Sequence, residues 1–164
     1  MRLLTILCLV LISVHSYSQD VINENETVTR DSLIYHQLST EPLTGTVVSF
    51  WDNGRLFTKI KYIDGKRVLY ESFHNNGQLN LRQNHIDFKS NNPWETFYDN
   101  GQLEFRGNSK DGKKEGLHMG FHKNGGLWYR TNYIDGKKEG LHVSFDETGN
   151  LTSRETYKNG ELVE

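Results

Sequence analysis

A phrase of the form Phe-x-x-[Asn/Thr]-Gly-x-Leu recurs five times along this chain. Successive copies begin 23, 24, 24 and 24 residues apart. The copies start at Phe50, Phe73, Phe97, Phe121 and Phe145. So regular a spacing indicates a repeat array, in which each structural unit stacks against the next. Arrays of this kind usually serve as binding surfaces, so the repeat points to binding before catalysis.

The copy between Gly116 and Gly140 shows what one repeat is expected to form. Apolar and polar residues alternate on both sides of an Asn-Gly turn, and this period of two predicts strands. The alternating apolar set comprises Leu117, Met119, Phe121, Leu127, Tyr129, Thr131 and Tyr133. Asn-Gly and Asp-Gly pairs predict turns because these residues tolerate a positive φ. The sequence therefore predicts an all-β fold, an elongated and twisted single sheet of antiparallel β-hairpins.

The loop length of each hairpin decides which residues share a face of the sheet. A three-residue loop pairs Phe121 with Leu127, whereas a two-residue loop pairs Phe121 with Trp128. We expect the three-residue loop, with Gly125 in the left-handed conformation, because it keeps the odd-numbered apolar residues together. On this reading the Phe and Leu ladders form the packed face.

A second turn, built on Asp-Gly or Asn-Gly, joins each hairpin to the next. It occurs at residues 64–65, 111–112, 135–136 and 159–160. One copy departs from the pattern, because Phe88 stands where glycine is expected and Pro93 follows. Proline has no N–H to give to a ladder, so we expect the sheet to be most irregular around residues 87–93.

The N-terminal residues have the features of a secretory signal. Met1-Arg2 supplies a positive start and residues 3–14 are an apolar run, too short for a permanent membrane span. We expect cleavage before Gln19, which divides the chain into a signal peptide (1–18), a flexible leader (19–32) and the repeat domain (33–164). The expected location is periplasmic or extracellular. Cys8 is lost with the signal, so the mature chain can form no disulfide.

Charge and motifs argue against several function classes. A formal net charge of −2 gives no case for nucleic acid. The sequence has neither a phosphate-binding loop nor a nucleophile elbow, so we expect no enzyme, no catalytic residues and no cofactor. Equivalent histidines such as His118 and His142 should lie roughly 9–10 Å apart, two strands away from each other. Zinc ligands must converge within about 2.1 Å of one centre, so no metal site is expected.

A basic residue follows each turn glycine by five positions. These bases are Lys59, Arg82, Arg106, Arg130 and Arg154. With aromatic residues on the same predicted face they define a candidate binding face. Its aromatic members are Trp51, Trp94, Tyr98 and Trp128. Two interpretations stand side by side: cross-strand cation–π pairs that stiffen a thin sheet, or a surface that binds a ligand.

The phrases Phe-x-x-Asn-Gly-x-Leu and Asp-Gly-Lys-Lys-Glu-Gly-Leu-His resemble the variant MORN repeat (membrane occupation and recognition nexus). The segment from Tyr35 to Phe50 is similar to the lead-in of bacterial YwqK-family antitoxins. The resemblance spans about residues 33–162. It implies twisted arrays of antiparallel hairpins and non-enzymatic interaction roles, with no catalytic residues to carry over.

Three functions are consistent with these observations. The first is a non-enzymatic exported repeat protein that mediates protein–protein interaction with an unidentified protein partner. The second is a binder of anionic glycan or lipid head groups through the basic and aromatic residues of the candidate face. The third, implied by the resemblance, is an antitoxin-like inhibitor of a partner toxin.

Overall fold

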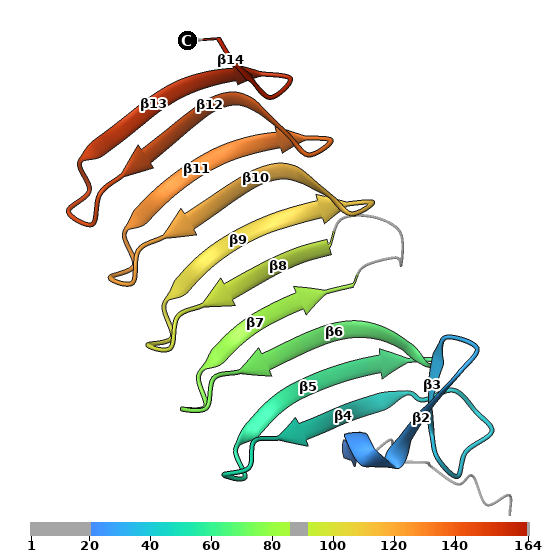
Figure 1. The fold of residues 1–164 in the computed structure, drawn as a ribbon. Coiled ribbons are helices and arrows are strands. Elements are labelled where there is room, and N and C mark those ends of the chain that lie inside the picture. The colour runs from blue at the N-terminus through green and yellow to red at the C-terminus, as the bar shows by residue number, and fades with distance from the viewer. Residues whose placement is uncertain (1–20, 86–91, 164) are drawn as a thin grey trace, which may run out of the picture.

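The computed structural model describes residues 21–85 and 92–163 and is an open, all-β repeat array (Figure 1). Twelve strands form one sheet in the order β1-β4-β5-β6-β7-β8-β9-β10-β11-β12-β13-β14. From β4 onward, neighbours along the chain are neighbours in the sheet and run antiparallel. The predicted fold class is confirmed.

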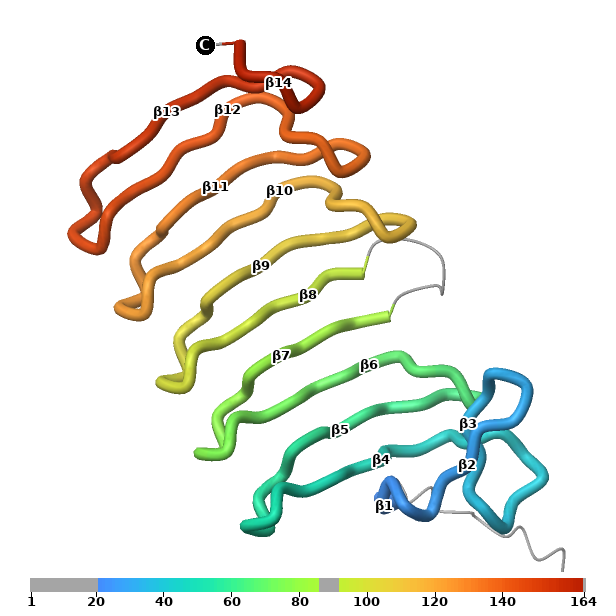
Figure 2. Tube along the Cα trace, in the orientation of Figure 1, coloured from blue at the N-terminus to red at the C-terminus, as the bar shows by residue number. Residues whose placement is uncertain are grey.

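The repeat strands are β4 (Gly45–Phe50), β5 (Leu56–Ile63), β6 (Lys66–Phe73), β7 (Leu79–Asn84), β8 (Asn92–Phe97), β9 (Leu103–Lys110), β10 (Lys113–Phe121), β11 (Leu127–Ile134), β12 (Lys137–Phe145) and β13 (Leu151–Lys158). The Cα trace shows the Asn-Gly turns together at one end of the strands and the Asp-Gly turns together at the other end (Figure 2).

Both turn types have the predicted backbone. In the first, Gly125 has a φ of 86°, its N–H donates to the His122 carbonyl, and Phe121 pairs with Leu127. The three-residue loop is therefore confirmed. In the second, Asp135 and Gly136 both have positive φ, at 49° and 85°, which is the two-residue hairpin turn that Asp-Gly favours.

A β-bulge directly after the Asn-Gly turn overturns the predicted faces. Phe121 pairs with Leu127, but the next pair is Gly120 with Tyr129, so Trp128 is an extra residue. The same register shift occurs in all five hairpins. One extra residue reverses the alternation for the rest of the strand. Tyr129 therefore lies on the face opposite Phe121, and the expectation that the odd-numbered apolar residues share one face is wrong.

A further bulge lies between hairpins. Glu115 pairs with Asn108 and Met119 with Arg106, so three residues of β10 stand opposite Gly107 alone. Gly116, the first of the three, has a φ of 71°. At the same place β6 carries a single unpaired residue, Val68. The first repeat step is 23 residues instead of 24 because β6 lacks a counterpart of Gly116.

Side chains at the Asn-Gly edge bond each repeat to the next. The residue after the repeat Phe reaches the backbone carbonyl of the following repeat's Phe. These bonds are Trp51 Nε1–Phe73 O (3.2 Å), His74 Nε2–Phe97 O (2.8 Å), Tyr98 Oη–Phe121 O (2.8 Å) and His122 Nε2–Phe145 O (2.9 Å). Asn100 Nδ2 and Asn124 Nδ2 add bonds to the next turn, at 2.8 and 2.7 Å. Residues of the Asn-Gly turns thus connect each turn to the next one. In a repeat array, each unit is stabilised by such contacts with its neighbours.

Tyr98→Phe isolates one of these bonds. It removes the hydroxyl that donates to Phe121 O and keeps the ring. We expect a loss of about 1 kcal/mol in the free energy of unfolding, the usual worth of a neutral hydrogen bond. Chemical denaturation of the two proteins measures it. An unchanged midpoint with an unchanged slope would show that the hydroxyl bonds water equally well.

The N-terminal end of the sheet is closed by residues assigned from sequence to a flexible leader. β1 (Val21–Asn23) pairs in parallel with β4, and a 3-10 turn, η1 (Glu24–Glu26), leads into the hairpin of β2 (Thr27–Arg30) and β3 (Leu33–His36). β3 bonds to the first Asp-Gly turn through Ile34 N–Gly65 O (3.0 Å).

This N-terminal cap contains the largest apolar core of the described residues. Ile22, Leu43 and Val47 are buried, with Ile34 and Tyr62 packed against them. Ile22 and the β2–β3 hairpin cover apolar surface that the first repeat would otherwise expose.

The last repeat ends differently at the opposite end of the sheet. Asp146 replaces the Trp, His or Tyr of earlier copies, and its carboxylate accepts from Thr148 N, Thr148 Oγ1 and Asn150 N within its own turn. These bonds hold the pKa of Asp146 at about 2. β14 (Glu161–Leu162) then covers the final two residues of β13.

The predicted irregularity at 87–93 falls mostly outside the described residues. Asn92 and Pro93 already belong to β8 and pair with Ser109 and Asn108. The pairing of β7 with β8 extends over three residue pairs, from Leu81↔Thr96 to Gln83↔Trp94.

Candidate functional site

The register divides the sheet into two faces of different chemistry. Directly paired residues lie on one face, so a row can be followed from strand to strand. One row runs Val48, Lys59, Glu71, Arg82, Glu95, Arg106, Met119, Arg130, Val143, Arg154. We call its side of the sheet the arginine face. The five Phe–Leu pairs lie on this face too, because Phe50 and Val48 are two residues apart in β4.

Carboxylates neutralise the bases in the N-terminal half of the row. Arg82 Nε lies 2.9 Å from Glu71 Oε1, and Lys59 Nζ lies 3.8 Å from Glu71 Oε2. Arg106 contacts Glu95 at 2.7 Å. Glu71 is buried, with 9% of its side chain exposed. The predicted basic row exists, but here it is a ladder of alternating charge.

The C-terminal half of the row alternates arginine with apolar residues. Arg130 stands between Met119 and Val143, and Arg154 pairs with Val143. Neither arginine has an ion pair within residues 21–85 and 92–163. The same repeat position therefore has two roles along the array.

The structure does not bring the predicted aromatic members onto this face. Trp94 is adjacent to Glu95 and lies on the opposite side. Trp51 and Tyr98 are at the turn edge and bond the next repeat. Trp128 is the extra residue of a bulge and is 51% exposed. The bulge after the turn separates the bases from the rings, so an arginine–aromatic groove does not form.

Arg82→Met tests the structural role of the charge ladder. It leaves the buried Glu71 carboxylate with Lys59 at 3.8 Å as its remaining ion pair. We expect a loss of roughly 1–2 kcal/mol in unfolding free energy, the scale of a hydrogen bond to a charged group. Arg130→Met, which removes no ion pair, is the matched control and should change stability by less than about 0.5 kcal/mol. Equal losses in thermal or urea unfolding would contradict the assignment.

The opposite side, which we call the aromatic face, carries a chain of contacting rings. Trp94 stacks on Phe105 with centroids 4.2 Å apart, Phe105 meets the edge of His118 at 5.5 Å, and His118 meets Tyr133 at 4.8 Å. Farther on, Tyr129 lies 6.1 Å from His142. One series of rings thus runs from β8 to β11, and a second runs from Tyr129 through His142 to Tyr157.

Glycines in the neighbouring strands make room for these rings. A Cβ on Gly107 would lie 2.7 Å from His118 Nδ1, and a Cβ on Gly120 would lie 2.3 Å from Tyr129 Cε1. Both distances are shorter than any ordinary contact. Glycine is thus required by close ring packing at two positions whose backbone is not left-handed.

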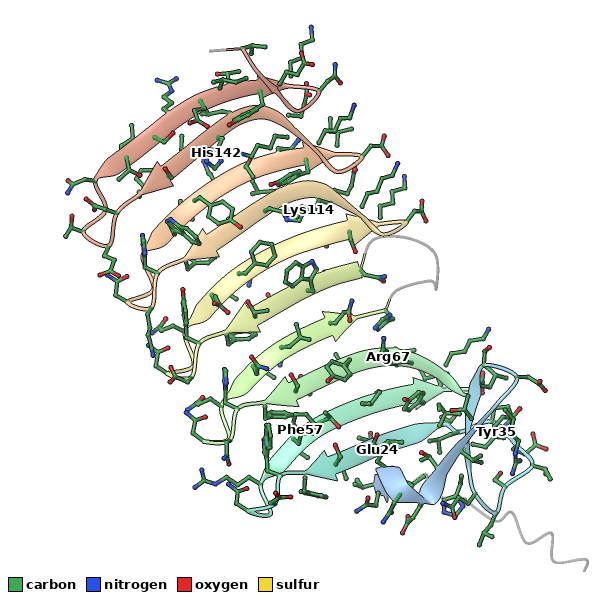
Figure 3. All side chains as sticks on the ribbon, viewed as in Figure 1. Glu24, Tyr35, Phe57, Arg67, Lys114 and His142 are labelled. Carbon is green, nitrogen blue, oxygen red and sulfur yellow. The ribbon has the colours of Figure 1, made fainter. Side chains whose placement is uncertain are left out.

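Basic side chains lie over tyrosine rings at the Asp-Gly side of the aromatic face. The distances to the ring centroids are 5.4 Å for Arg67 Cζ on Tyr70, 4.8 Å for Lys114 Nζ on Tyr133 and 4.4 Å for Lys138 Nζ on Tyr157. Each base is the second residue after a turn glycine. Figure 3 labels Arg67, Lys114 and His142 on this side of the sheet. The face therefore combines rings with positive charge.

His118 and His142 occupy equivalent positions but have different surroundings. His118 is 1% exposed and its Nε2 lies 2.8 Å from the Asn108 carbonyl. His142 is half-buried, and in both rings Nδ1 is buried without a hydrogen-bond partner. Burial lowers the pKa of both rings, so both are neutral near pH 7.

A shallow hollow of about 360 Å³ opens on the aromatic face across β11 and β12. It is lined by Trp128, Tyr129, Thr131, Tyr133, Lys138, His142 and Ser144. Thr131 is 1% exposed and its Oγ1 has no hydrogen-bond partner. An apolar hollow with a few convergent polar groups is the usual form of a ligand site.

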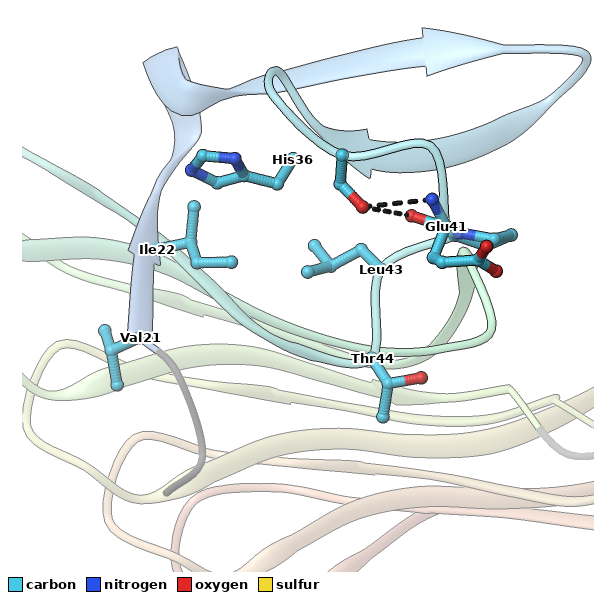
Figure 4. Close-up of a pocket in the computed structure, with 8 residues that line it drawn as sticks. Val21, Ile22, His36, Glu41, Leu43 and Thr44 are labelled. Carbon is cyan, nitrogen blue, oxygen red and sulfur yellow. Dashed lines mark hydrogen bonds between the residues drawn. The ribbon is translucent and has the colours of Figure 1, made fainter. Parts of the chain in front are cut away.

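A larger hollow, about 600 Å³, lies in the N-terminal cap (Figure 4). Its polar groups already have partners: Ser39 Oγ bonds both Glu41 N and Glu41 O at 3.0 Å, and His36 Nδ1 accepts from Leu38 N at 3.3 Å. The remaining lining is mostly apolar and adjoins the Ile22–Leu43 core. This hollow is better explained by packing of the cap than by ligand binding.

Within residues 21–85 and 92–163, no three His, Cys, Asp or Glu side chains are placed to hold a metal ion. Over the same residues, no helix has the length and apolar character needed to cross a membrane.

Comparison with protein families finds a match within the array. The model of the MORN repeat variant matches residues 91–111 and 138–159, which include the phrases beginning at Phe97 and Phe145. Two repeats of the array thus match the MORN repeat variant. The hairpins at Phe50, Phe73 and Phe121 share the register and bulge of the two matched copies. Proteins with MORN repeats are typically non-catalytic.

The comparisons reach no further than the repeat. A search of curated proteins returns no relative that matches the chain. The family match does not extend to the antitoxins that the lead-in resembles.

Sequence reasoning missed Lys114, Lys138 and the hollow. The lysines occur in the recurring Lys-Lys-Glu-Gly, and their repetition is the signal that could have found them. Thr131 stands where the preceding repeat has Gly107, a difference that becomes visible when the five copies are aligned.

Proposed function

We propose that this MORN-variant array is a non-enzymatic, exported binding protein that holds an extended segment of a protein partner on its aromatic face. The observation that carries the proposal is the pair of ring series on this face, Trp94 to Tyr133 and Tyr129 to His142, with Lys114 and Lys138 beside them. Aromatic residues are among the types enriched where proteins bind proteins.

The arginine face supports binding of an anionic glycan or lipid less well. Glu71 and Glu95 neutralise Lys59, Arg82 and Arg106, so this half of the row presents little net positive charge. The ion pairs of this face are explained by their role in holding neighbouring strands together.

Selection of peptides tests the proposal. A displayed library of random linear 12-residue peptides is panned on the protein, and the dissociation constants of enriched peptides are measured. We expect Tyr129→Ser with Tyr133→Ser to weaken binding at least tenfold, because these rings form part of the aromatic face. Arg106→Gln with Arg130→Gln, on the arginine face, is the control and should change binding less than threefold. Enriched peptides that depend on the arginines instead would contradict the proposal, as would the absence of any enriched peptide.

Export rests on the signal features of residues 1–18. N-terminal sequencing of the exported form is expected to begin at Gln19. An exported form that begins elsewhere, or protein retained in the cytoplasm, would contradict this part.

A further inference from the structure

The hollow on β11 and β12 arises from one difference between successive repeats. In the β9–β10 hairpin connection, Gly107 has no side chain, and the His118 ring descends onto the strand. There His118 Nε2 reaches the Asn108 carbonyl at 2.8 Å. One repeat later Thr131 stands in the place of Gly107, and His142 in the place of His118.

The side chain of Thr131 prevents the His142 ring from packing against the strand as the His118 ring packs against Gly107. Among the described residues, His142 makes no hydrogen bond to the Asn132 carbonyl, the counterpart of Asn108 O, whereas Nδ1 is unpartnered in both rings. The hollow of about 360 Å³ lies at this place, with both Thr131 and His142 in its lining. The site is therefore specific to one repeat and is not a property of every hairpin.

The hollow is surrounded by groups that can donate hydrogen bonds. Thr131 Oγ1 is buried without a partner. Among the described residues, no hydrogen bond involves the hydroxyl of Tyr129 or that of Tyr133. Burial and the nearby Tyr133 raise the pKa of the Tyr129 hydroxyl, so it remains a donor. An unsatisfied buried polar group is costly, which favours a ligand that accepts hydrogen bonds.

The charge around the hollow also favours an acceptor. Lys138 lines it, Lys114 lies over the Tyr133 ring, and neither has an ion pair within residues 21–85 and 92–163. An acid near the hollow is Glu155, which is paired with His142 across β12 and β13. Its carboxylate already accepts from Ser153 Oγ at 3.0 Å and Tyr157 Oη at 2.6 Å. Two ammonium groups thus face one carboxylate that is already hydrogen-bonded.

We propose that the hollow between β11 and β12 binds a carboxylate group carried on an aromatic or apolar segment. This inference rests on the proposed function, since the carboxylate would belong to an acidic residue of the bound peptide. Lys138 supplies charge, and the hydroxyls of Thr131, Tyr129 and Tyr133 supply donors. Trp128 and Tyr129 offer apolar surface to the carrier.

A small probe tests the site without the partner. Phenylacetate and its neutral isostere phenylacetamide are titrated into the protein, and two-dimensional NMR follows the Thr131 amide and the His142 ring. We expect phenylacetate to shift both signals in a saturable way, and phenylacetamide to bind at least tenfold more weakly. Equal binding of the two probes, or shifts confined to other residues, would overturn the inference.

Four variants, one of them a control, separate the contributions of charge and shape. Lys138→Gln should weaken phenylacetate at least tenfold. Lys137→Gln, its neighbour on the opposite face, is the control and should leave binding unchanged. Thr131→Gly should let His142 settle as His118 does and abolish binding. Thr131→Val keeps the shape and should weaken binding several-fold, so the test survives if Thr131→Gly does not fold. Binding that all these variants retain would place the probe elsewhere and overturn the inference.

Failure of this inference and failure of the proposed function give different results. If the selected peptides bind through Tyr129 and Tyr133 but contain no required Asp or Glu, the aromatic face binds and the carboxylate site is wrong. If phenylacetate binds at Thr131 while no peptide depends on the aromatic face, the carboxylate site stands and the peptide-binding function is wrong.

Discussion

Gly107→Thr is expected to lower the free energy of unfolding by about 2–3 kcal/mol, the upper part of the range for overpacked sites. A Cβ at this position would lie 2.7 Å from His118 Nδ1 and 2.8 Å from Phe105 Cζ. Both rings belong to the continuous aromatic chain, and His118 would also lose its bond to the Asn108 carbonyl. Urea unfolding, read by intrinsic fluorescence and by circular dichroism, measures the change.

The equivalent position in the next repeat supplies the control. Thr131→Val keeps a β-branched side chain and removes a buried hydroxyl that has no hydrogen-bond partner. We expect it to be neutral or slightly stabilising, because no hydrogen bond is lost. If Gly107→Thr costs no more than Thr131→Val, His118 does not depend on the space above Gly107, and the explanation of the hollow fails with it.

Phe97→Ala is expected to cost about 2–3 kcal/mol, somewhat below the range for a fully buried phenylalanine because Phe97 is half-buried. Phe97 pairs with Leu103 in the middle of the array and has hairpins on both sides. Phe145 pairs with Leu151, which is 56% exposed and belongs to the last full strand.

Phe145→Ala should therefore cost less, by about 1 kcal/mol or more, because stability in an array is shared between neighbours. Chemical denaturation of both variants provides the comparison. Equal losses at the two sites would indicate one cooperative core instead of neighbour-based stability.

The repeat, the turns and the fold class could be predicted because they depend on local chemistry. Asn-Gly and Asp-Gly specify their backbone wherever they occur, and Gly125 and Asp135 have the expected positive φ. The pairing of Phe121 with Leu127 followed from loop length alone.

The faces could not be predicted because they depend on one extra residue per hairpin. Trp128 carries no signal of a bulge, being neither glycine nor a turn former, yet its insertion moves Tyr129, Thr131 and Tyr133 to the side opposite Phe121. A bulge formed by an ordinary residue is invisible to alternation counting, which assumes an unbroken period of two. The candidate binding face therefore combined residues from both sides of the sheet and from its turn edge.

The binding role of the aromatic face is tested most directly at two adjacent residues on opposite faces. A photoreactive p-benzoylphenylalanine is placed at Tyr129 or at Arg130, and each protein is irradiated with the tightest peptide from the library selection. Cross-linked peptide is then quantified by mass spectrometry. The aromatic face as binding surface predicts a cross-link from position 129 and little or none from position 130. Efficient cross-linking from position 130 with none from position 129 would contradict it.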